Sequence, residues 1–209
     1  MVTVDCGVSS AEEVELASSM GMDTIVTDHH SVPPSLPDAV ALVNPRRPGS
    51  HYPYDGLTGV GIAFKVAEAL WTDLGRPRPV QLLDLVALGT VADVGPLTGE
   101  NRYLVKEGLR LLNETRNPGL RALIARSGLS LGSLNTESLS FGLIPRLNAA
   151  GRLSSASTSL DLLTADSAES AEAIADTLEL HNDERRRLTA EGVAQAHGQV
   201  QLQDGTAPP

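Results

Sequence analysis

Acidic and histidine side chains follow two short apolar stretches near the start of the chain. Asp5 comes directly after a β-branched run, and Asp28, His29 and His30 end the next apolar stretch. Carboxylate oxygens and imidazole nitrogens together suit Mn²⁺ or a related divalent ion. Histidine pairs also occur as ordinary loop residues, and an aspartate close to Gly7 can simply form a turn. A metal site and an ordinary loop are therefore both open interpretations.

The elements that would position these residues have the pattern of alternating strands and a helix. Residues 2–4 and 23–28 are predicted strands, and a capped helix is predicted between Ser10 and Gly21. A strand, a helix and a strand in this order predict a parallel βαβ unit with a right-handed crossover. Residues 39–43 form a third predicted strand. Because open parallel sheets place their sites at the carboxyl ends of strands, the two polar groups are expected close together.

The remainder of the chain is predicted to be helical. Apolar residues recur at helical spacing in six segments, which are residues 61–74, 80–94, 100–113, 118–126, 139–153 and 167–193. The predicted fold class is therefore α/β, a truncated parallel sheet of about three strands with helices, followed by a helical layer and a long connecting helix. Asp93 stands near the end of a strongly apolar segment, where a carboxylate needs a partner. A metal ion and a local interaction are both open for it.

The charge distribution is uneven. The formal net charge of −10 disfavours a non-specific nucleic-acid binder, which depends on neutralising phosphates. Residues 101–152 nevertheless carry eight Lys or Arg against three Glu, which is compatible with a local phosphate-binding face or with solvated helix surfaces. The single cysteine, Cys6, excludes an internal disulfide, and no apolar run approaches the ~20 residues that cross a bilayer. We expect a cytoplasmic protein without a membrane partner.

Three successive motifs resemble those of the DHH phosphoesterase superfamily. They are Val4-Asp5-Cys6-Gly7, Asp28-His29-His30 and Leu88-Gly-Thr-Val-Ala-Asp93. Three further blocks resemble RecJ-like single-strand-specific DNA exonucleases, namely Asn44-Pro-Arg-Arg-Pro48, Gly59-Val-Gly-Ile-Ala-Phe-Lys65 and Pro145-Arg-Leu-Asn-Ala-Ala-Gly-Arg152. The similarity begins at the N-terminus and extends into the last predicted helix. The ordered set is far more specific than any one of its motifs.

The resemblance implies a site for two metal ions, usually Mn²⁺ or otherwise Mg²⁺, that hydrolyses phosphodiesters. It assigns Asp5 as the carboxylate that bridges both ions. It makes His29 and Asp93 ligands of one ion and His30 a contact to the scissile phosphate. Asp28 is implied to be a secondary ligand or to fix the histidines. Asp5, His29, His30 and Asp93 are thus the predicted catalytic set.

Five polar residues are predicted to contact a nucleic-acid backbone. They are Arg146, Asn148 and Arg152, with weaker indications for Arg46 and Lys65. Arginine forks match phosphate oxygens, and the small residues in the block around Asn148 let a strand approach the backbone closely. The open alternative is a structural turn in which the arginines pair with the abundant acids.

The predicted function is metal-dependent phosphodiester hydrolysis on single-stranded DNA by a RecJ-like 5′→3′ exonuclease core. Alternatives are a DHH phosphodiesterase of oligonucleotides or cyclic dinucleotides, and a non-catalytic remnant that binds nucleic acid or protein. Residues 1–165 are expected to form a partial DHH domain, residues 166–198 a connecting helix toward a second domain, and residues 199–209 a disordered tail. We expect an incomplete part of the enzyme, because the family's Asp-x-Asp and Gly-Gly-His motifs do not occur in the sequence.

Overall fold

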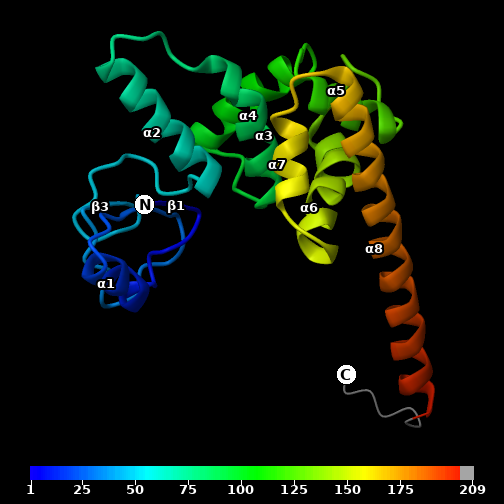
Figure 1. Ribbon diagram of the computed structural model, residues 1–209, viewed down its shortest axis with the longest axis horizontal. Helices are drawn as coiled ribbons and strands as arrows, with labels where there is room; N and C mark the ends of the chain where they lie inside the picture. The colour runs from blue at the N-terminus through cyan, green and yellow to red at the C-terminus, as the bar shows by residue number, and fades with distance from the viewer. Residues whose placement is uncertain (203–209) are drawn as a thin grey trace. The chain divides into compact units, whose positions relative to one another are not determined.

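The computed structural model describes residues 1–202, which form two compact units. The first unit contains residues 1–115 and 134–139, and the second contains residues 116–133 and the described residues from 140 onward (Figure 1). The predicted domain boundary at residue 165 came from the family resemblance and stays a prediction. All of the predicted residues at the ends of the strands lie in the first unit.

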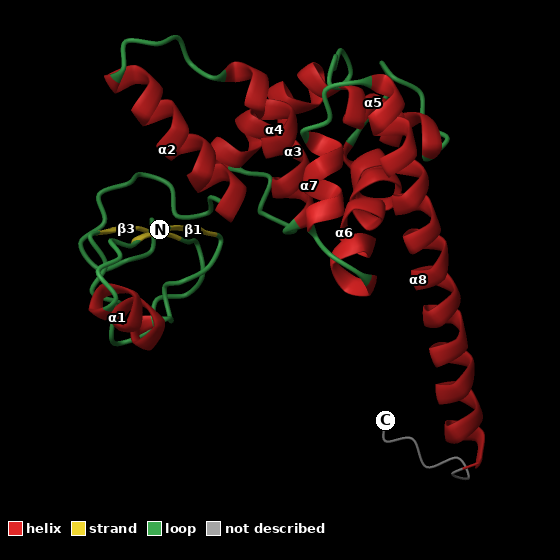
Figure 2. Ribbon diagram, in the orientation of Figure 1, coloured by secondary structure: helices red, strands yellow, loops and turns green. Residues whose placement is uncertain are grey.

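Three short strands form a parallel sheet in the first unit. The strands β1 (Val2–Val4), β2 (Ile25–Thr27) and β3 (Ala41–Val43) lie in this order, with Val2 paired to Ile25 and Ile25 to Ala41. Helix α1 (Ala11–Ser19) makes the crossover from β1 to β2 and lies on the opposite side of the sheet from helix α2 in Figure 2. The predicted parallel sheet is confirmed, although its second and third strands are shorter than predicted.

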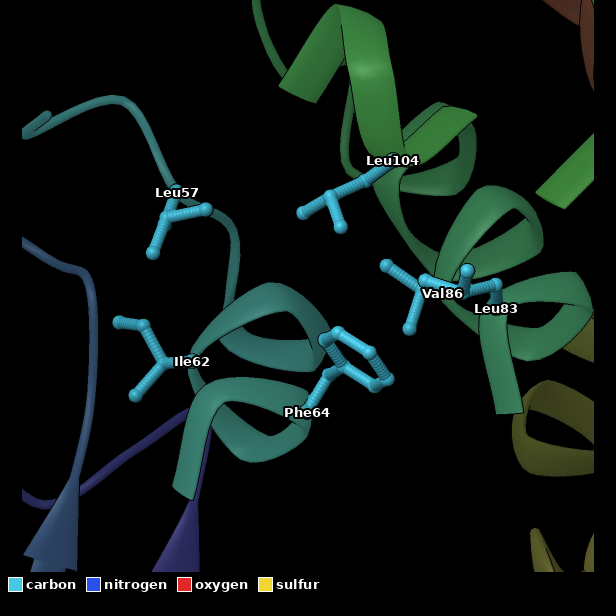
Figure 3. Close-up of a cluster of buried hydrophobic side chains, with 6 residues drawn as sticks. All are labelled: Leu57, Ile62, Phe64, Leu83, Val86 and Leu104. Carbon is cyan, nitrogen blue, oxygen red and sulfur yellow. The ribbon is translucent and has the colours of Figure 1, made fainter. Parts of the chain in front are cut away.

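Three longer helices complete the first unit. They are α2 (Gly59–Asp73), α3 (Leu83–Ala92) and α4 (Gly99–Leu112). Their apolar faces meet in a buried cluster of six side chains, which are Leu57, Ile62, Phe64, Leu83, Val86 and Leu104 (Figure 3). The segment predicted as one helix over 80–94 instead begins with a 3₁₀ turn at Val80–Leu82. This packing fixes the carboxyl end of α3, after which Asp93 follows.

The second unit is helical throughout its regular elements. Helix α5 (Pro118–Arg126) begins with a proline in its first turn, and the Asn117 side chain caps it by accepting a hydrogen bond from the Leu120 amide at 2.9 Å. A π-helical segment (Ser138–Leu143), whose first two residues belong to the first unit, leads into α6 (Ile144–Leu153). The sequence had predicted these two as one helix.

Two more helices follow α6. Helix α7 (Ser157–Leu163) was not predicted, because its seven residues are too few for a clear helical pattern of apolar residues. Helix α8 (Ala168–Leu202) packs against α5, α6 and α7. It continues through residues 199–202, which the sequence had assigned to the tail, whereas residues 203–209 lie outside the described residues. No helix within residues 1–202 has the length and apolar character needed to span a membrane.

Candidate metal centre

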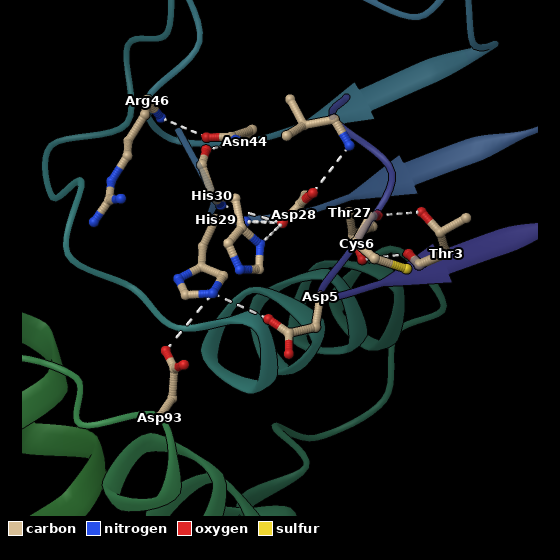
Figure 4. Close-up of polar contacts among 11 residues, drawn as sticks. Thr3, Asp5, Cys6, Thr27, Asp28, His29, His30, Asn44, Arg46 and Asp93 are labelled. Atoms are coloured by element: carbon tan, nitrogen blue, oxygen red, sulfur yellow. Dashed lines mark hydrogen bonds and ion pairs between the residues drawn. The ribbon is translucent and has the colours of Figure 1, made fainter. Parts of the chain in front are cut away.

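Three side chains meet just beyond the sheet and helix α3, and Figure 4 shows them pointing toward one another. The Nε2 atom of His29 lies 3.1 Å from Oδ1 of Asp5 and 3.6 Å from Oδ2 of Asp93. Ligand atoms of Asp5, His29 and His30 all lie within 4.8 Å of one another. The expectation that strand ends and the end of α3 bring these residues together is therefore confirmed in geometry.

The His29 imidazole is well placed to bind a cation. Its Nε2 atom is buried and makes no hydrogen bond to any residue that the structure describes. The side chains of Asp5 and Asp93 are 55% and 40% exposed, so their carboxylates are open to solvent on one side and face His29 on the other. A buried imidazole nitrogen that makes no hydrogen bond and faces two carboxylates is a mixed nitrogen and oxygen ligand set.

Asp28 holds His29 and His30 in place through hydrogen bonds. Its buried carboxylate accepts hydrogen bonds from the amides of Val8 (2.9 Å), His29 (2.8 Å) and His30 (3.1 Å) and contacts Nδ1 of His30 at 2.7 Å. The Asp28 carboxylate thus has four partners. It does not belong to the group of described residues whose potential ligand atoms lie within 4.8 Å of one another, which is Asp5, His29 and His30. The structure thus supports a positioning role for Asp28, and its interpretation as a metal ligand is not supported by this geometry.

The contact between Asp28 and His30 changes the pKa of both groups. Burial raises the pKa of Asp28, but the hydrogen bonds from Val8, His30 and His29 outweigh it, so the pKa is lowered. The pKa of His30 is raised, chiefly by its hydrogen bond to Asp28, with burial acting against it and the charges of Asp5 and Asp93 adding to it. The His30 side chain is 59% exposed, so the Nε2 edge of its ring faces solvent. The raised pKa favours the cationic form of this ring.

The backbone is strained on both sides of the site. Asp5 has a φ of 66° and Val94 a φ of 55°, which are in the left-handed region that residues other than glycine rarely adopt. The amide of Asp5 donates to the carbonyl of Thr27 at 2.9 Å, so β2 holds the strained residue in place. Strain of this kind is found where the surrounding structure fixes a side chain for a function.

A cleft of about 340 Å³ opens next to the site. It is lined by His29, His30, Ser31, Arg46, Gly56, Thr58, Asp93, Val94, Gly95 and Pro96. Arg46, one of the predicted nucleic-acid contacts, is thus beside the candidate metal ligands. Lys65 does not line this cleft, and its ammonium group is instead paired with Glu68 and Glu100. For Lys65 the structure therefore favours an internal ion pair.

The other predicted nucleic-acid contacts lie in the second unit, on α6. The side chain of Arg146 is only 13% exposed. Its Nε and Nη2 atoms both donate to Glu179, while Nη1 donates to the Gly142 carbonyl at 2.7 Å. This is the alternative that the sequence left open, a structural arginine paired with an acid. Asn148 and Arg152 are exposed, and no ion pair of Arg152 occurs within the described part of the chain.

Asn44 was quoted in a motif but not identified as a site residue. It is buried, its Nδ2 atom donates to the His30 carbonyl at 3.0 Å, and its Oδ1 atom accepts from the Arg46 amide at 2.8 Å. The sequence signal was the Asn-Pro pair after the third strand, which is typical of a turn. That signal predicts a turn but not the two residues that the turn connects.

Comparison with known proteins bears directly on this site. The model of the DHH family, N-terminal domain, matches residues 1–90, which include Asp5 and the Asp28-His29-His30 motif. Residues 1–90 are thus similar to the DHH family over the segment that holds three of the candidate site residues, Asp5, His29 and His30. The resemblance inferred from the motifs is therefore confirmed.

Similarity to curated relatives extends beyond residue 90. It is 41% identical over 203 residues to the single-stranded-DNA-specific exonuclease RecJ of Bacillus subtilis (strain 168), an alignment that covers 97% of the chain and 25% of that protein. Its fold is similar to that of a crystal structure of exonuclease RecJ bound to manganese, with a TM-score of 0.86 and 36% identity over 95% of this chain and 50% of the other.

A second solved relative is RecJ from Thermus thermophilus in complex with Mn²⁺. Its TM-score is 0.83 at 36% identity, covering 93% of this chain and 29% of that one. The predicted fold class is thus confirmed by structures as well as by the strand topology. The chain spans a quarter of the length of the Bacillus subtilis relative and half or less of each of these two crystallised chains.

Proposed function

We propose that this chain carries the metal-binding part of an exonuclease that acts on single-stranded DNA, with Mn²⁺ or Mg²⁺ as its cofactor. The observation that carries the proposal is the buried Nε2 atom of His29, which lies between the carboxylates of Asp5 and Asp93 without a hydrogen bond. The similarity to RecJ of Bacillus subtilis, a single-stranded-DNA-specific exonuclease, supports the choice of substrate. The two relatives solved with manganese support the choice of ion.

The residues present fit a divalent ion. Asp5, His29 and Asp93 would hold it, because they supply two carboxylates and an imidazole nitrogen that are already directed at one another. The family resemblance implies that Asp5 would also help to hold a second ion. When bound, the ions supply Lewis-acid polarisation of the phosphodiester. No protein nucleophile is required for this chemistry.

His30 is assigned to the phosphate rather than to the ion. Its Nδ1 atom is held by Asp28, so the Nε2 edge of the ring is the edge that can reach a ligand. The raised pKa of His30 favours the imidazolium form, which donates to a phosphate oxygen. Asp28 orients the ring and the two histidine amides and does not itself meet the substrate.

The strand of DNA also needs contacts beyond the reacting phosphate. We assign these to Asn148 and Arg152, which are exposed on α6, and leave Arg146 with a structural role because Glu179 holds its guanidinium group. An exposed arginine can pair with backbone phosphates without reading the bases, which suits an enzyme that degrades any sequence.

The proposal is tested by titrating the 209-residue chain with Mn²⁺, using the electron paramagnetic resonance signal of the free ion. Asp5→Asn and His29→Asn are expected to lower the affinity about tenfold or more, because each removes a ligand, whereas the exposed control Asp38→Asn leaves it unchanged. Because the sequence lacks the family's Asp-x-Asp motif, little or no Mn²⁺-dependent digestion of end-labelled single-stranded DNA is expected from this chain by itself. Unchanged Mn²⁺ affinity in both site variants would contradict the proposal.

A further inference from the structure

Two consecutive arginines in the loop after β3 face different surroundings. Arg46 lines the cleft that also contains His29 and Asp93. Arg47 lines a separate pocket of about 360 Å³, whose other residues include Lys65. The two arginines share a backbone segment and a charge, yet only one of them is beside the candidate metal ligands.

The position of Arg46 is set by a buried side chain. Asn44 is 2% exposed, and its amide group connects the His30 carbonyl to the Arg46 amide through hydrogen bonds of 3.0 and 2.8 Å (Figure 4). Since buried polar groups are costly to leave without partners, this bridge holds the two segments in a fixed relation. The loop that carries Arg46 therefore cannot shift independently of His30.

The guanidinium group of Arg46 has donors left for a ligand. Its Nε atom donates to the Asp55 carbonyl at 3.1 Å, which fixes the direction of the group. Within residues 1–202, no carbonyl or side chain is found to accept from its two Nη atoms, and the residue is exposed. An oriented guanidinium with two unused Nη donors matches the geometry of a phosphate group.

The charges around the site make such a donor useful. Asp5 and Asp93 are the acids that face the Nε2 atom of His29, and among the described residues neither forms an ion pair with Arg46. A phosphodiester that approaches these carboxylates is repelled unless positive charge is supplied. Arg46 can supply that charge from the loop after β3, because it lines the same cleft as His29 and Asp93.

We propose that Arg46 binds a non-bridging oxygen of the phosphate that lies next to the metal centre. Asn44 is the positioning residue that fixes the backbone of Arg46 relative to the backbone of His30. The inference rests on the proposed function, because the phosphate belongs to the DNA strand. It assigns the two neighbouring arginines different tasks, since Arg47 has no part in holding this phosphate.

The test compares Arg46→Ala with the matched control Arg47→Ala in the 209-residue chain. Binding of a fluorescein-labelled oligothymidylate is measured by fluorescence anisotropy in saturating Mn²⁺ at several salt concentrations. Arg46→Ala is expected to weaken binding about tenfold or more, because a charged hydrogen bond is lost. It is also expected to reduce the slope of log K against log salt concentration by roughly 0.7, the value for one phosphate contact on a single strand. Arg47→Ala leaves the slope unchanged.

The role of Asn44 has its own readout. If Asn44 acts through Arg46, then Asn44→Ala weakens oligothymidylate binding, and adding Arg46→Ala to that variant causes a smaller further loss than Arg46→Ala causes alone. Equal losses in the two backgrounds would show that Asn44 contributes only to stability. Arg46→Lys, which keeps the charge but loses the fork, is expected to restore the salt slope and only part of the affinity.

The outcomes separate this inference from the proposed function. Mn²⁺ affinity, measured on the same variants, is expected to stay within about twofold in Arg46→Ala, because Arg46 is not a metal ligand. If the unaltered chain binds Mn²⁺ and oligothymidylate but the two arginine variants behave alike, the inference is wrong and the proposed function stands. Loss of Mn²⁺ affinity in Arg46→Ala also overturns the inference. If the unaltered chain binds neither Mn²⁺ nor oligothymidylate, both fail.

Discussion

Gly59 and the carboxylate of Asp5 occupy adjoining space, so that a Cβ atom on residue 59 would lie 2.1 Å from Oδ1 of Asp5. The first residue of α2 can therefore only be glycine while Asp5 keeps its position. Gly59→Ala is expected to displace the Asp5 side chain and to weaken Mn²⁺ binding about tenfold or more, one ligand being moved out of place. The Mn²⁺ titration described above measures this change.

Gly61→Ala is the matched control for that variant. It adds the same methyl group to the same helix, but the nearest atom to its Cβ is the end of the Leu57 side chain at 3.2 Å, which can move aside. Mn²⁺ affinity is expected to stay within about threefold of that of the unaltered chain, because no ligand is touched. Equal losses in the two variants would show that any alanine near the start of α2 disturbs the site.

Removing the charge of Asp28 is expected to affect both stability and His30. Asp28→Asn loses acceptor capacity for four hydrogen bonds at a buried position, which should lower the free energy of unfolding by about 2–3 kcal/mol. The pKa of His30 is expected to fall, because its hydrogen bond to Asp28 is what raises it. Urea denaturation and the titration of the His30 ring in NMR spectra measure the two effects, with the exposed Asp38→Asn as the control.

The two arginines of α6 are expected to differ in their contribution to stability. Arg146→Ala leaves Glu179 without its partner in a largely buried position, so the free energy of unfolding should fall by about 2 kcal/mol or more. Arg152→Ala removes an exposed side chain and should change it by less than about 0.5 kcal/mol. If chemical denaturation gives the same small loss for both, then Arg146 is not the structural residue that its contacts indicate.

The ion pairs of Lys65 give a specific pH dependence. Burial raises the pKa of Glu68, but the hydrogen bonds and charges of Lys65 and Arg78 outweigh it, so the pKa lies below its ordinary value of 4.5. For Lys65, burial lowers the pKa, but Glu68 and Glu100 outweigh it, so the pKa lies above its ordinary value of 10.5. Folding therefore gains stability from Glu68 at pH values above 4.5 and from Lys65 at pH values below 10.5, and loses each contribution outside that window.

Glu68→Gln tests the acidic side of this window. The unaltered chain is expected to lose stability as the pH falls below 4.5 and Glu68 becomes protonated. The variant should be less stable by about 1 kcal/mol at about pH 7, a value reduced by solvent screening, and should show a shallower decline toward about pH 3. Urea midpoints across this acidic range measure the difference. The exposed variant Glu12→Gln should keep the slope of the unaltered chain.

Much of the fold could be predicted because its patterns are local. The β-branched run before Asp5 and the apolar run before Asp28 were sufficient to predict parallel strands, and helical spacing located the first residues of α2 to α5 and of α8 within a few residues. The ends of helices were less certain, as α8 shows by continuing to Leu202. Helix α7 has too few residues for its apolar spacing to stand out.

The candidate site could be predicted only in part. Asp5, His29 and Asp93 were identifiable because they follow strands and a helix in motifs of known type. The bridge through Asn44 connects a residue just after β2 to one in a later loop, and the partner of Arg146 lies on a different helix. Such contacts depend on tertiary packing, which cannot be predicted from the spacing of residues within one segment of the sequence.

The three side chains of the candidate metal centre, Asp5, His29 and Asp93, come from three distant parts of the chain, the segments that follow β1, β2 and α3. An ion held by all of them acts as a reversible crosslink that exists only in the folded state, because the unfolded chain does not bring these residues together. By mass action, a concentration about one hundred times the dissociation constant adds about 2.7 kcal/mol to the free energy of unfolding. The thermal midpoint of the sheet-containing unit is therefore expected to rise with the free divalent-ion concentration.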